Sequence, residues 1–386
     1  MTNCRADRPM STRKVARRAG PVATVALTVC LGLTACGSSS KATGSSRTTA
    51  SSGTTASSGT TTPAAASTAS AQKVPLVLYA AEGYDTAEGA AFQKATGISV
   101  QVDDNSTGPL TTQIEAEKNN PKWNLFWVDG ATVFASLDSQ GLLHKGFQPT
   151  AYANYNAVGK SLIPSDNSYV PTGVTMAAAL VYNTKTVSSP PTSWSDLAGS
   201  QYKGAIGMND PSVSGPTYPY VAGQMQHLGG VSQGEAYFSA LKANGLHVYQ
   251  TNTNTLQALE TGVIKVATIQ SSAGVGAGFK NPNIKVTYLS PETVLPSVLG
   301  ISAGAKGTVL SEAEQFINFV LSPAGQKVMQ SGDPTGDSLF WPLINGESPL
   351  SPLPPLSSVP TQTLNPNTWG PQQASVDTWF TRHVVQ

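Results

Sequence analysis

Two short turns carry the same residue types in the same setting. "STGPL" at 106–110 and "VSGPT" at 213–217 each place a hydroxyl, a glycine and a proline between a strand-like run and a helix-like run. Proline suits the first position of a helix, and the preceding hydroxyl or glycine suits the cap. The N-terminus of a helix also attracts anions and carbonyl oxygens. The two turns therefore predict either a shared oxyanion site or ordinary helix capping.

Two carboxylates occupy similar strand-to-helix turns. Glu82 lies in "YAAEGYD" (79–85) and Asp129 in "WVDGAT" (127–132). They could receive a cationic amine of a ligand whose anionic end binds the hydroxyl turns, which would give a zwitterion such as an aminophosphonate a reason to bind. Either acid could equally cap the helix that follows it.

Catalytic and metal-binding patterns are fragmentary. "SALK" at 239–242 matches S-x-x-K and "SDN" stands at 165–167, but their order is wrong for penicillin-recognising enzymes and no K-T-G follows. No H-E-x-x-H or P-loop is present, and no cysteine follows Cys36. We therefore predict a protein that is not an enzyme, with no catalytic residues, no cofactor and no metal site.

The elements that must position these turns alternate. The predicted strands are 74–80, 98–104, 123–129, 178–184, 246–252, 263–270 and 284–290, and the predicted helices are 84–95, 109–119, 131–141, 234–244 and 311–329. This rhythm predicts an α/β fold with mainly parallel sheets, in which ligands bind at the carboxyl ends of the strands.

The N-terminus resembles a secretory signal that ends in a lipobox. A basic stretch precedes the apolar "PVATVALTVCLGL" and then "LTAC" at 33–36. We predict a lipoprotein signal peptide over 1–35, starting at Met1 or Met10, and lipidation of Cys36. A plain exported protein cleaved nearby and an uncleaved anchor helix are the alternatives. The Ser/Thr/Gly/Ala composition that follows predicts a disordered tether, so that 36–72 comprises the lipidated cysteine and this tether.

The net charge does not identify the ligand, but it argues against one class of partner, nucleic acid. Removing residues 1–36 leaves 17 basic against 21 acidic residues, a net charge of −4. A mildly acidic body with mixed charge argues against nucleic acid.

Several segments together resemble the extracellular solute-binding proteins of bacterial ABC importers. They are "VLYAAEGYDTAEGAAFQKATGISVQV", "YNTKTVSSPPTSWSDLAGSQYKGAIGMNDPSVSG" and "INFVLSPAGQKVM", which follow one another over roughly residues 73–345. The branch that binds ferric iron, thiamine and 2-aminoethylphosphonate is the most similar. The resemblance implies a type II periplasmic-binding-protein fold with a ligand cleft between two lobes. It places lobe 1 at 73–177 and lobe 2 at 178–290, with 291–386 returning to lobe 1 and ending in a Pro-rich wrap.

The resemblance also implies which residues bind the ligand. They come from the turns described above: Glu82, Gly83, Tyr84, Ser106, Thr107, Gly108, Asp129, Ser212, Ser214, Gly215, Thr217, Tyr218, Ser271 and Ser272. Iron binders of this family show two adjacent tyrosines where this chain reads "QSSAGVG" (270–276). This departure disfavours ferric iron and favours a phosphonate, phosphate ester or carboxylate held by neutral donors.

The predicted function is that of a substrate-binding lipoprotein that captures a small anionic or zwitterionic solute and delivers it to the permease. We expect a monomer attached through Cys36 to the outer face of the cytoplasmic membrane. A ferric-iron-binding importer protein is the alternative. A surface lipoprotein with an interaction or hydrolytic role is the third reading, and the Pro-rich end (348–373) would then serve as an interaction arm. Otherwise that end is expected to wrap lobe 1 and to pack Trp369 and Trp379.

Overall fold

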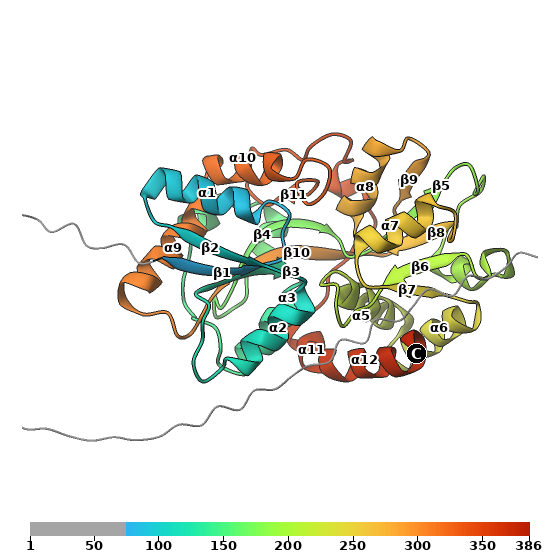
Figure 1. Ribbon diagram of the computed structural model, residues 1–386, viewed down its shortest axis with the longest axis horizontal. Coiled ribbons are helices and arrows are strands. Elements are labelled where there is room, and N and C mark those ends of the chain that lie inside the picture. The colour runs from blue at the N-terminus through green and yellow to red at the C-terminus, as the bar shows by residue number, and fades with distance from the viewer. Residues whose placement is uncertain (1–74) are drawn as a thin grey trace, which may run out of the picture. The chain divides into compact units, whose positions relative to one another are not determined.

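A computed structural model describes residues 75–386 and contains two β-sheets with helices packed on them (Figure 1). The predicted signal peptide, Cys36 and tether lie outside the described residues. Among the residues described, no helix has the length and apolar character that a membrane span requires.

The seven-stranded sheet forms the core of what we call the first lobe. Its strand order is β11-β4-β10-β3-β1-β2, and β12 pairs with β10. The bounds are β1 Leu76–Ala80, β2 Val100–Asp104, β3 Leu125–Asp129, β4 Val170–Met176, β10 Glu292–Ile301, β11 Trp341–Pro342 and β12 Thr361–Gln362. Every residue of β3 and β10 is buried, as expected for central strands that are covered on both faces.

The five-stranded sheet forms the core of the second lobe, with strand order β7-β6-β8-β5-β9. The bounds are β5 Ala179–Asn183, β6 Ile206–Asn209, β7 His247–Tyr249, β8 Val266–Ile269 and β9 Ile284–Thr287. The chain passes between the sheets after β4 and again before β10. Both sheets are mixed rather than mainly parallel, because β10 runs antiparallel to β3 and β4, and β5 runs antiparallel to β8 and β9.

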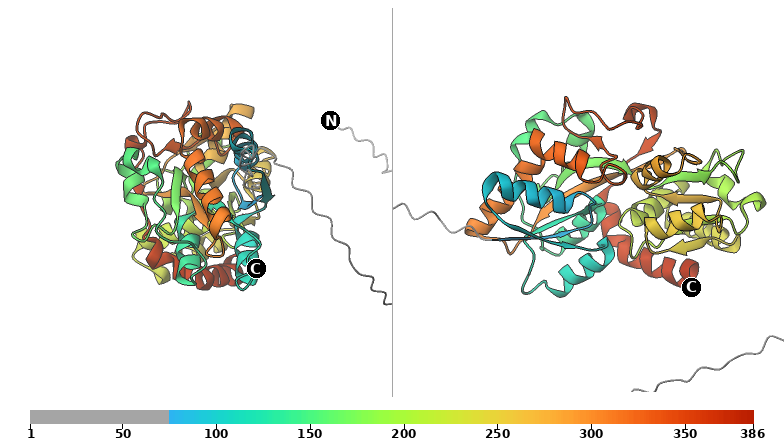
Figure 2. Two further views of the ribbon diagram at one scale, coloured as in Figure 1. Left: turned by 90° about the vertical axis from the view of Figure 1, so that its left-hand side faces the viewer. Right: turned by 45° about the horizontal axis from the view of Figure 1, so that its top comes forward.

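Helices cover both sheets (Figures 1 and 2). The helices of the first lobe are α1 Asp85–Thr96, α2 Thr107–Ala116, α3 Ala131–Ser139, α4 Ala157–Leu162, α9 Gly307–Val320 and α10 Pro323–Gly332. Those of the second lobe are α5 Thr217–Leu228, α6 Val231–Ala243, α7 Asn252–Glu260 and α8 Ser271–Lys280. The single helix predicted over 311–329 is two helices, because Ser322 caps a new one through the N–H of Gly325 and Pro323 occupies its first position.

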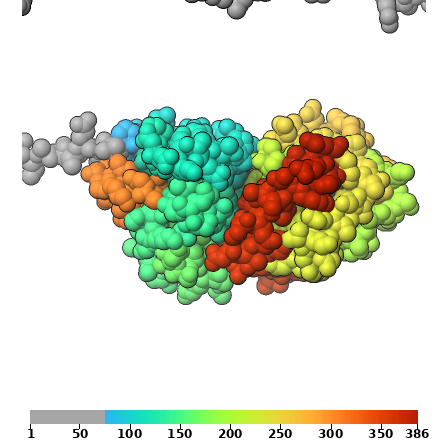
Figure 3. Space-filling view, turned by 90° about the horizontal axis from the view of Figure 1, so that it is seen from below, coloured from blue at the N-terminus to red at the C-terminus, as the bar shows by residue number. Residues whose placement is uncertain are grey.

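The C-terminal segment does not wrap the first lobe alone. It contains α11 Pro366–Trp369 and α12 Gln373–Phe380. Trp369 belongs to the hydrophobic cluster of the second lobe, and Trp379 packs against the same cluster. Gly370 lies against the carbonyl of Thr132 at the start of α3, so the segment touches both lobes. Figure 3 shows this red segment crossing one face between the green first lobe and the yellow second lobe.

Four hydrophobic clusters form the cores, and all of them lie within the compact unit Ala69–Gln386. Two clusters pack against the seven-stranded sheet and two against the five-stranded sheet. Since this unit contains all four hydrophobic clusters, it should fold as an independent fragment.

One ionisable side chain in the first lobe makes stability depend on pH. Glu88 of α1 is fully buried, and both of its carboxyl oxygens lack a hydrogen-bond partner among the described residues. Burial raises the pKa of Glu88 to about 9, whereas an unfolded glutamate titrates near ~4.3. Between these values the folded protein holds a proton that the unfolded chain has released. The free energy of unfolding therefore falls as pH rises.

We predict that Glu88→Gln removes this part of the pH dependence. Wild type should lose up to about 4 kcal/mol more than the variant between about pH 5 and pH 8, since each unit of pH contributes up to about 1.4 kcal/mol. Urea unfolding followed by circular dichroism measures the difference. Glu260→Gln, at the exposed end of α7, is the control and should retain the wild-type slope. Parallel pH curves for wild type and Glu88→Gln would contradict the assignment.

Candidate ligand-binding cleft between the lobes

A cavity of about 220 Å³ opens between the two lobes, at the carboxyl ends of strands from both sheets. Asp129 ends β3 of the first lobe, and Gln270 follows β8 of the second. None of the thirteen lining residues is Lys, Arg or His: they are Ala81, Ser106, Thr107, Asp129, Ser214, Gly215, Pro216, Gln250, Thr251, Asn252, Thr253, Gln270 and Asp337. The cleft is therefore polar and acidic.

The two hydroxyl-glycine-proline turns meet at this cavity. The N–H of Gly108 donates to the carbonyl of Val213 at 3.2 Å. A Cβ on Gly108 would lie 2.1 Å from the carbonyl oxygen of Ser212, and one on Gly215 would lie 2.3 Å from Thr107 Oγ1. Glycine is required at position 108 because backbone from the opposite lobe occupies the space of a side chain.

Three carboxyl groups lie in and directly behind the cavity without a basic partner. Asp129 is 6% exposed and Glu82 is 3% exposed. Burial, together with the negative charges of neighbouring carboxylates, raises the pKa of Asp129 and of Glu82 well above the usual range. Burial also raises the pKa of Asp337, with the nearby charge of Asp333 acting in the same direction. Each carboxylate thus resists ionisation while the others are charged.

Neutral donors hold these acids in place. The hydroxyl of Ser297 on β10 donates to Glu82 Oε1 at 2.8 Å and accepts from the indole N–H of Trp127 at 2.9 Å. The N–H of Gly83 donates to Asp337 Oδ2 at 2.9 Å. Hydrogen bonds fix the positions of the acids, but they leave the negative charge uncompensated.

The second lobe supplies a chain of hydrogen-bonded amides, in which Asn209 and Gln270 are buried and Asn252 is partly buried. Thr255 Oγ1 donates to Asn209 Oδ1 at 2.6 Å, and Asn209 Nδ2 donates to Asn252 Oδ1 at 2.7 Å. Asn252 Nδ2 donates to Gln270 Oε1 at 3.3 Å, and Gln270 Nε2 donates to Asp129 Oδ2 at 2.7 Å. All donors along this chain point toward the first lobe.

Five of the predicted ligand-binding residues line the cavity: Ser106, Thr107, Asp129, Ser214 and Gly215. Glu82, Gly83 and Ser272 lie behind it and contact its acids or the groups that hold them, since Ser272 Oγ donates to Asp337 Oδ1 at 3.3 Å. Gly108 and Ser212 border an adjacent groove that also contains Asp377.

The remaining four predicted residues also lie outside the cavity lining. The Tyr218 hydroxyl donates to the carbonyl of Trp369, and its ring belongs to the core of the second lobe. Thr217 is buried beside it at the start of α5. The ring of Tyr84 packs against Trp127 at 5.3 Å between centroids. Ser271 Oγ accepts the N–H of Met176 at 3.0 Å, and this bond ties α8 to the end of β4.

Sequence reasoning missed several lining residues. Gln270 and Asn252 both follow strands of the second sheet, so the rule that ligands bind at the carboxyl ends of strands was a usable signal for them. Asp337 lies in a loop after α10, more than two hundred residues from Glu82 in the chain. No local pattern in the sequence places it in the cleft.

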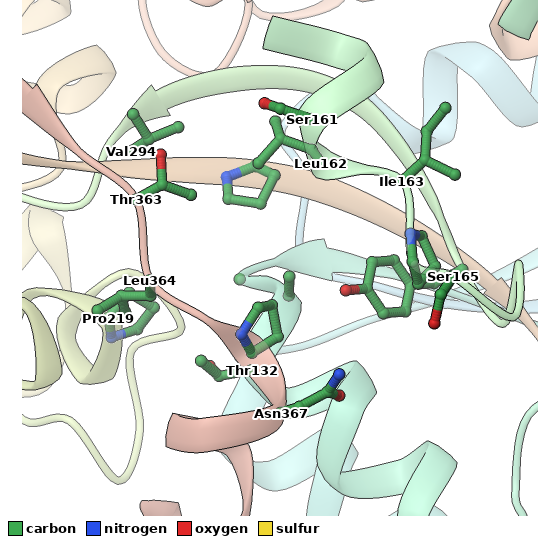
Figure 4. A pocket seen from close by; sticks show the side chains of 16 residues that line it. Thr132, Ser161, Leu162, Ile163, Ser165, Pro219, Val294, Thr363, Leu364 and Asn367 are labelled. Atoms are coloured by element: carbon green, nitrogen blue, oxygen red, sulfur yellow. The ribbon is translucent and has the colours of Figure 1, made fainter.

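A second cavity, of about 250 Å³, lies between the start of α3, the end of α4, strand β10 and the C-terminal segment. Figure 4 shows the aliphatic side chains of Leu162, Val294 and Leu364 around it, with Pro219 from the second lobe. Its lining contains no ionisable carboxylate or amine. It differs in this respect from the acidic cleft.

The described residues contain no group of three or more His, Cys, Asp or Glu side chains arranged to hold a metal ion. Tyr84 and Tyr218, which an oxygen-ligand iron site would need, have their hydroxyls directed at Ser297 and at the Trp369 carbonyl. This arrangement gives no support to ferric iron as the cargo.

The chain has the two-lobed α/β architecture, with a polar cleft between the lobes, that solute-binding proteins have. The sequence profile of the family described as "Bacterial extracellular solute-binding protein" matches residues 89–336. The chain belongs to this family and is the solute-binding component of an ABC importer.

Curated relatives and solved structures agree with this family. A protein of Salmonella paratyphi A named "Putative 2-aminoethylphosphonate-binding periplasmic protein" is 23% identical over 242 residues, 61% of this chain and 68% of the relative. The periplasmic binding protein AfuA from Actinobacillus pleuropneumoniae, solved with fructose-6-phosphate, has a TM-score of 0.71 at 19% identity, covering 81% of this chain and 98% of AfuA. Iron-bound HitA from Pseudomonas aeruginosa has a TM-score of 0.69 at 24% identity, covering 79% and 98%.

We predict that Gly108→Ala opens the cleft. The added methyl group would collide with backbone of the opposite lobe, and overpacking of this kind costs about 1–3 kcal/mol. Small-angle X-ray scattering of the 69–386 unit should show a larger radius of gyration with an unchanged circular dichroism spectrum. Gly278→Ala in α8, where a Cβ would make an ordinary 3.4 Å contact, is the control. An unchanged radius of gyration for Gly108→Ala would contradict the close approach.

Proposed function

We propose that the protein captures a small zwitterion, whose ammonium group lies beside Asp129 and Asp337 and whose oxyanion lies at the two hydroxyl turns. The observation that carries this proposal is the cavity lining, which contains two carboxyl groups, several hydroxyl groups and no basic side chain. A simple anion would face the carboxylates without compensation. An ammonium group on the same molecule would provide that compensation.

The hydroxyl groups that line the cleft are suited to donate hydrogen bonds. Ser214 Oγ accepts from Asn209 Nδ2 at 3.2 Å, and an amide nitrogen cannot accept in return. The Ser214 proton is therefore directed elsewhere, and Ser214 borders the cavity. Ser106 and Thr107 lie opposite, at the start of α2, where the helix dipole favours negative charge.

An aminophosphonate has the chemistry that this lining requires. The similarity to a relative named "Putative 2-aminoethylphosphonate-binding periplasmic protein" supports the same ligand class. We infer further that the protein is non-catalytic, monomeric and anchored by a lipid on Cys36 to the outer face of the cytoplasmic membrane, and that it is made with the predicted signal peptide and tether. The lobe boundaries at 177/178 and 290/291 belong to this proposal as well.

We predict that 2-aminoethylphosphonate stabilises the 69–386 unit in a thermal-shift assay, whereas ethylphosphonate, which lacks the amine, binds far more weakly. Asp129→Asn should weaken 2-aminoethylphosphonate binding by roughly 10- to 100-fold, because a hydrogen bond to a charged group contributes about 1.5–3 kcal/mol. Asp103→Asn on strand β2 is the control, since Asp103 does not line the cavity.

The possible outcomes separate the competing functions. Equal affinity for 2-aminoethylphosphonate and ethylphosphonate would contradict the proposal that the carboxylates bind the ammonium group. A shift with ferric iron alone, accompanied by a phenolate charge-transfer band, would replace the zwitterion with iron and leave the importer function in place. Hydrolysis of a generic ester without ligand stabilisation would instead support the enzyme alternative.

Ligand binding should also release protons. The raised pKa values of Asp129, Glu82 and Asp337 mean that the empty cleft retains protons that an incoming ammonium group would displace. Affinity for 2-aminoethylphosphonate should therefore rise with pH until the amine itself loses its charge. Calorimetric titrations in buffers of different ionisation enthalpy should give a buffer-dependent binding enthalpy. An enthalpy that is the same in all buffers would exclude proton release.

A further inference from the structure

The two lobes are joined across the cleft by one short side-chain hydrogen bond. Gln270 Nε2 of the second lobe donates to Asp129 Oδ2 of the first at 2.7 Å. Gln270 is 4% exposed and Asp129 is 6% exposed, so little water competes for this bond. The other polar contacts between the lobes near the cleft are longer. They are Met176 N–H to Ser271 at 3.0 Å, Gly108 to Val213 at 3.2 Å, Ser272 to Asp337 at 3.3 Å, and a second bond from Gln270 Nε2 itself, to Thr175 Oγ1 on β4, at 3.4 Å.

Gln270 has no freedom to turn its amide around. Its Oε1 accepts from Asn252 Nδ2, and Asn252 Oδ1 accepts from Asn209 Nδ2. Asn209 Oδ1 in turn accepts from Thr255, which is fully buried on α7. Reversing the Gln270 amide would place its oxygen against the Asp129 carboxylate and its nitrogen against the nitrogen of Asn252. The chain of amides therefore fixes a donor toward Asp129.

We propose that Gln270 is a positioning residue that latches the two lobes together in the ligand-free protein, and that Asn252 and Asn209 aim it at Asp129. The latch needs no ligand, because every donor and acceptor in it belongs to the chain. It therefore sets the fraction of empty protein that is closed. That fraction in turn scales the apparent affinity for whichever solute the cleft binds.

Gln270 also differs from the residues of the proposed ligand site in what it does. Ser214 and Asp129 are proposed to contact the solute, whereas Gln270 acts on Asp129 from the opposite lobe. The proposal holds for any cargo of this cleft. Its failure would leave the proposed zwitterion binding untouched, because the test below uses no ligand.

The test measures the distance between the lobes in the empty protein. The three cysteines of the chain are at positions 4, 30 and 36, so the 69–386 unit contains none. Spin labels at Lys118→Cys, after α2, and Glu260→Cys, at the end of α7, report the separation of the lobes by double electron–electron resonance. We expect Gln270→Ala to lower the ratio of closed to open protein about tenfold, the order of change expected when one short, buried hydrogen bond is lost. Asn252→Ala should lower it less.

A paired substitution separates a latch from general damage to the fold. Gln270→Glu alone sets a second carboxylate against Asp129 and should open the protein further than Gln270→Ala. Combining Gln270→Glu with Asp129→Asn restores one donor and one acceptor with their roles exchanged, so it should recover the closed distance. Gln257→Ala, on the exposed face of α7, is the control and should leave the distance unchanged. Wild-type distances in Gln270→Ala, or no recovery in the pair, would overturn the proposal.

Discussion

Negative charge without a basic partner is the constraint on which this cleft depends. Glu82, Asp129 and Asp337 lie close enough to raise one another's pKa, and only neutral groups hydrogen-bond to them. Burying such groups is costly in a protein whose net stability is small. A binding protein can keep them because a cation on the ligand recovers part of that cost on binding. The same buried carboxyl groups therefore destabilise the empty protein and make the cleft selective for a ligand that carries a cation.

Strand β10, which follows the second passage of the chain between the sheets, connects these carboxyl groups to the framework of the first lobe. Ser297 sits in the middle of β10 and bonds to Glu82 from the loop after β1, to Trp127 on β3 and to Thr172 on β4. One hydroxyl therefore joins three strands at the point where the chain passes between the lobes. A movement of β10 when the lobes open would shift the hydrogen bond between Ser297 and Glu82. Opening would then be coupled to the electrostatics of the cleft.

The sequence allowed the fold class to be predicted because the strands of the first lobe are short, apolar and separated by amphipathic helices. Prediction from local sequence patterns failed where tertiary packing overrides the helix or strand propensity of the residues. Helix α5 contains Pro219 and Gly223 in its interior and has no clear apolar period, yet it forms because most of its residues are buried against the second lobe. Strand β10 contains Pro296, a residue that argues against a central strand, although β10 is the central strand of its sheet. For the site, the turns with repeated composition were visible, but Asp337 and the orientation of Gln270 arise from contacts between distant segments.

The groups of the cleft that titrate and the groups that do not titrate have different roles. The chain from Thr255 through Asn209 and Asn252 to Gln270 consists of a hydroxyl and amides, which keep the same donors and acceptors at every physiological pH. The groups that meet the solute's ammonium are carboxyls, whose charge changes with pH and with the ligand itself. The second-lobe part of the latch is therefore a neutral network, while Asp129, its acceptor in the first lobe, and the affinity for a charged solute both respond to pH. A salt bridge in place of the Gln270–Asp129 contact would have joined these two properties, because a lysine there would both latch the lobes and neutralise the charge that the cleft keeps for its cargo.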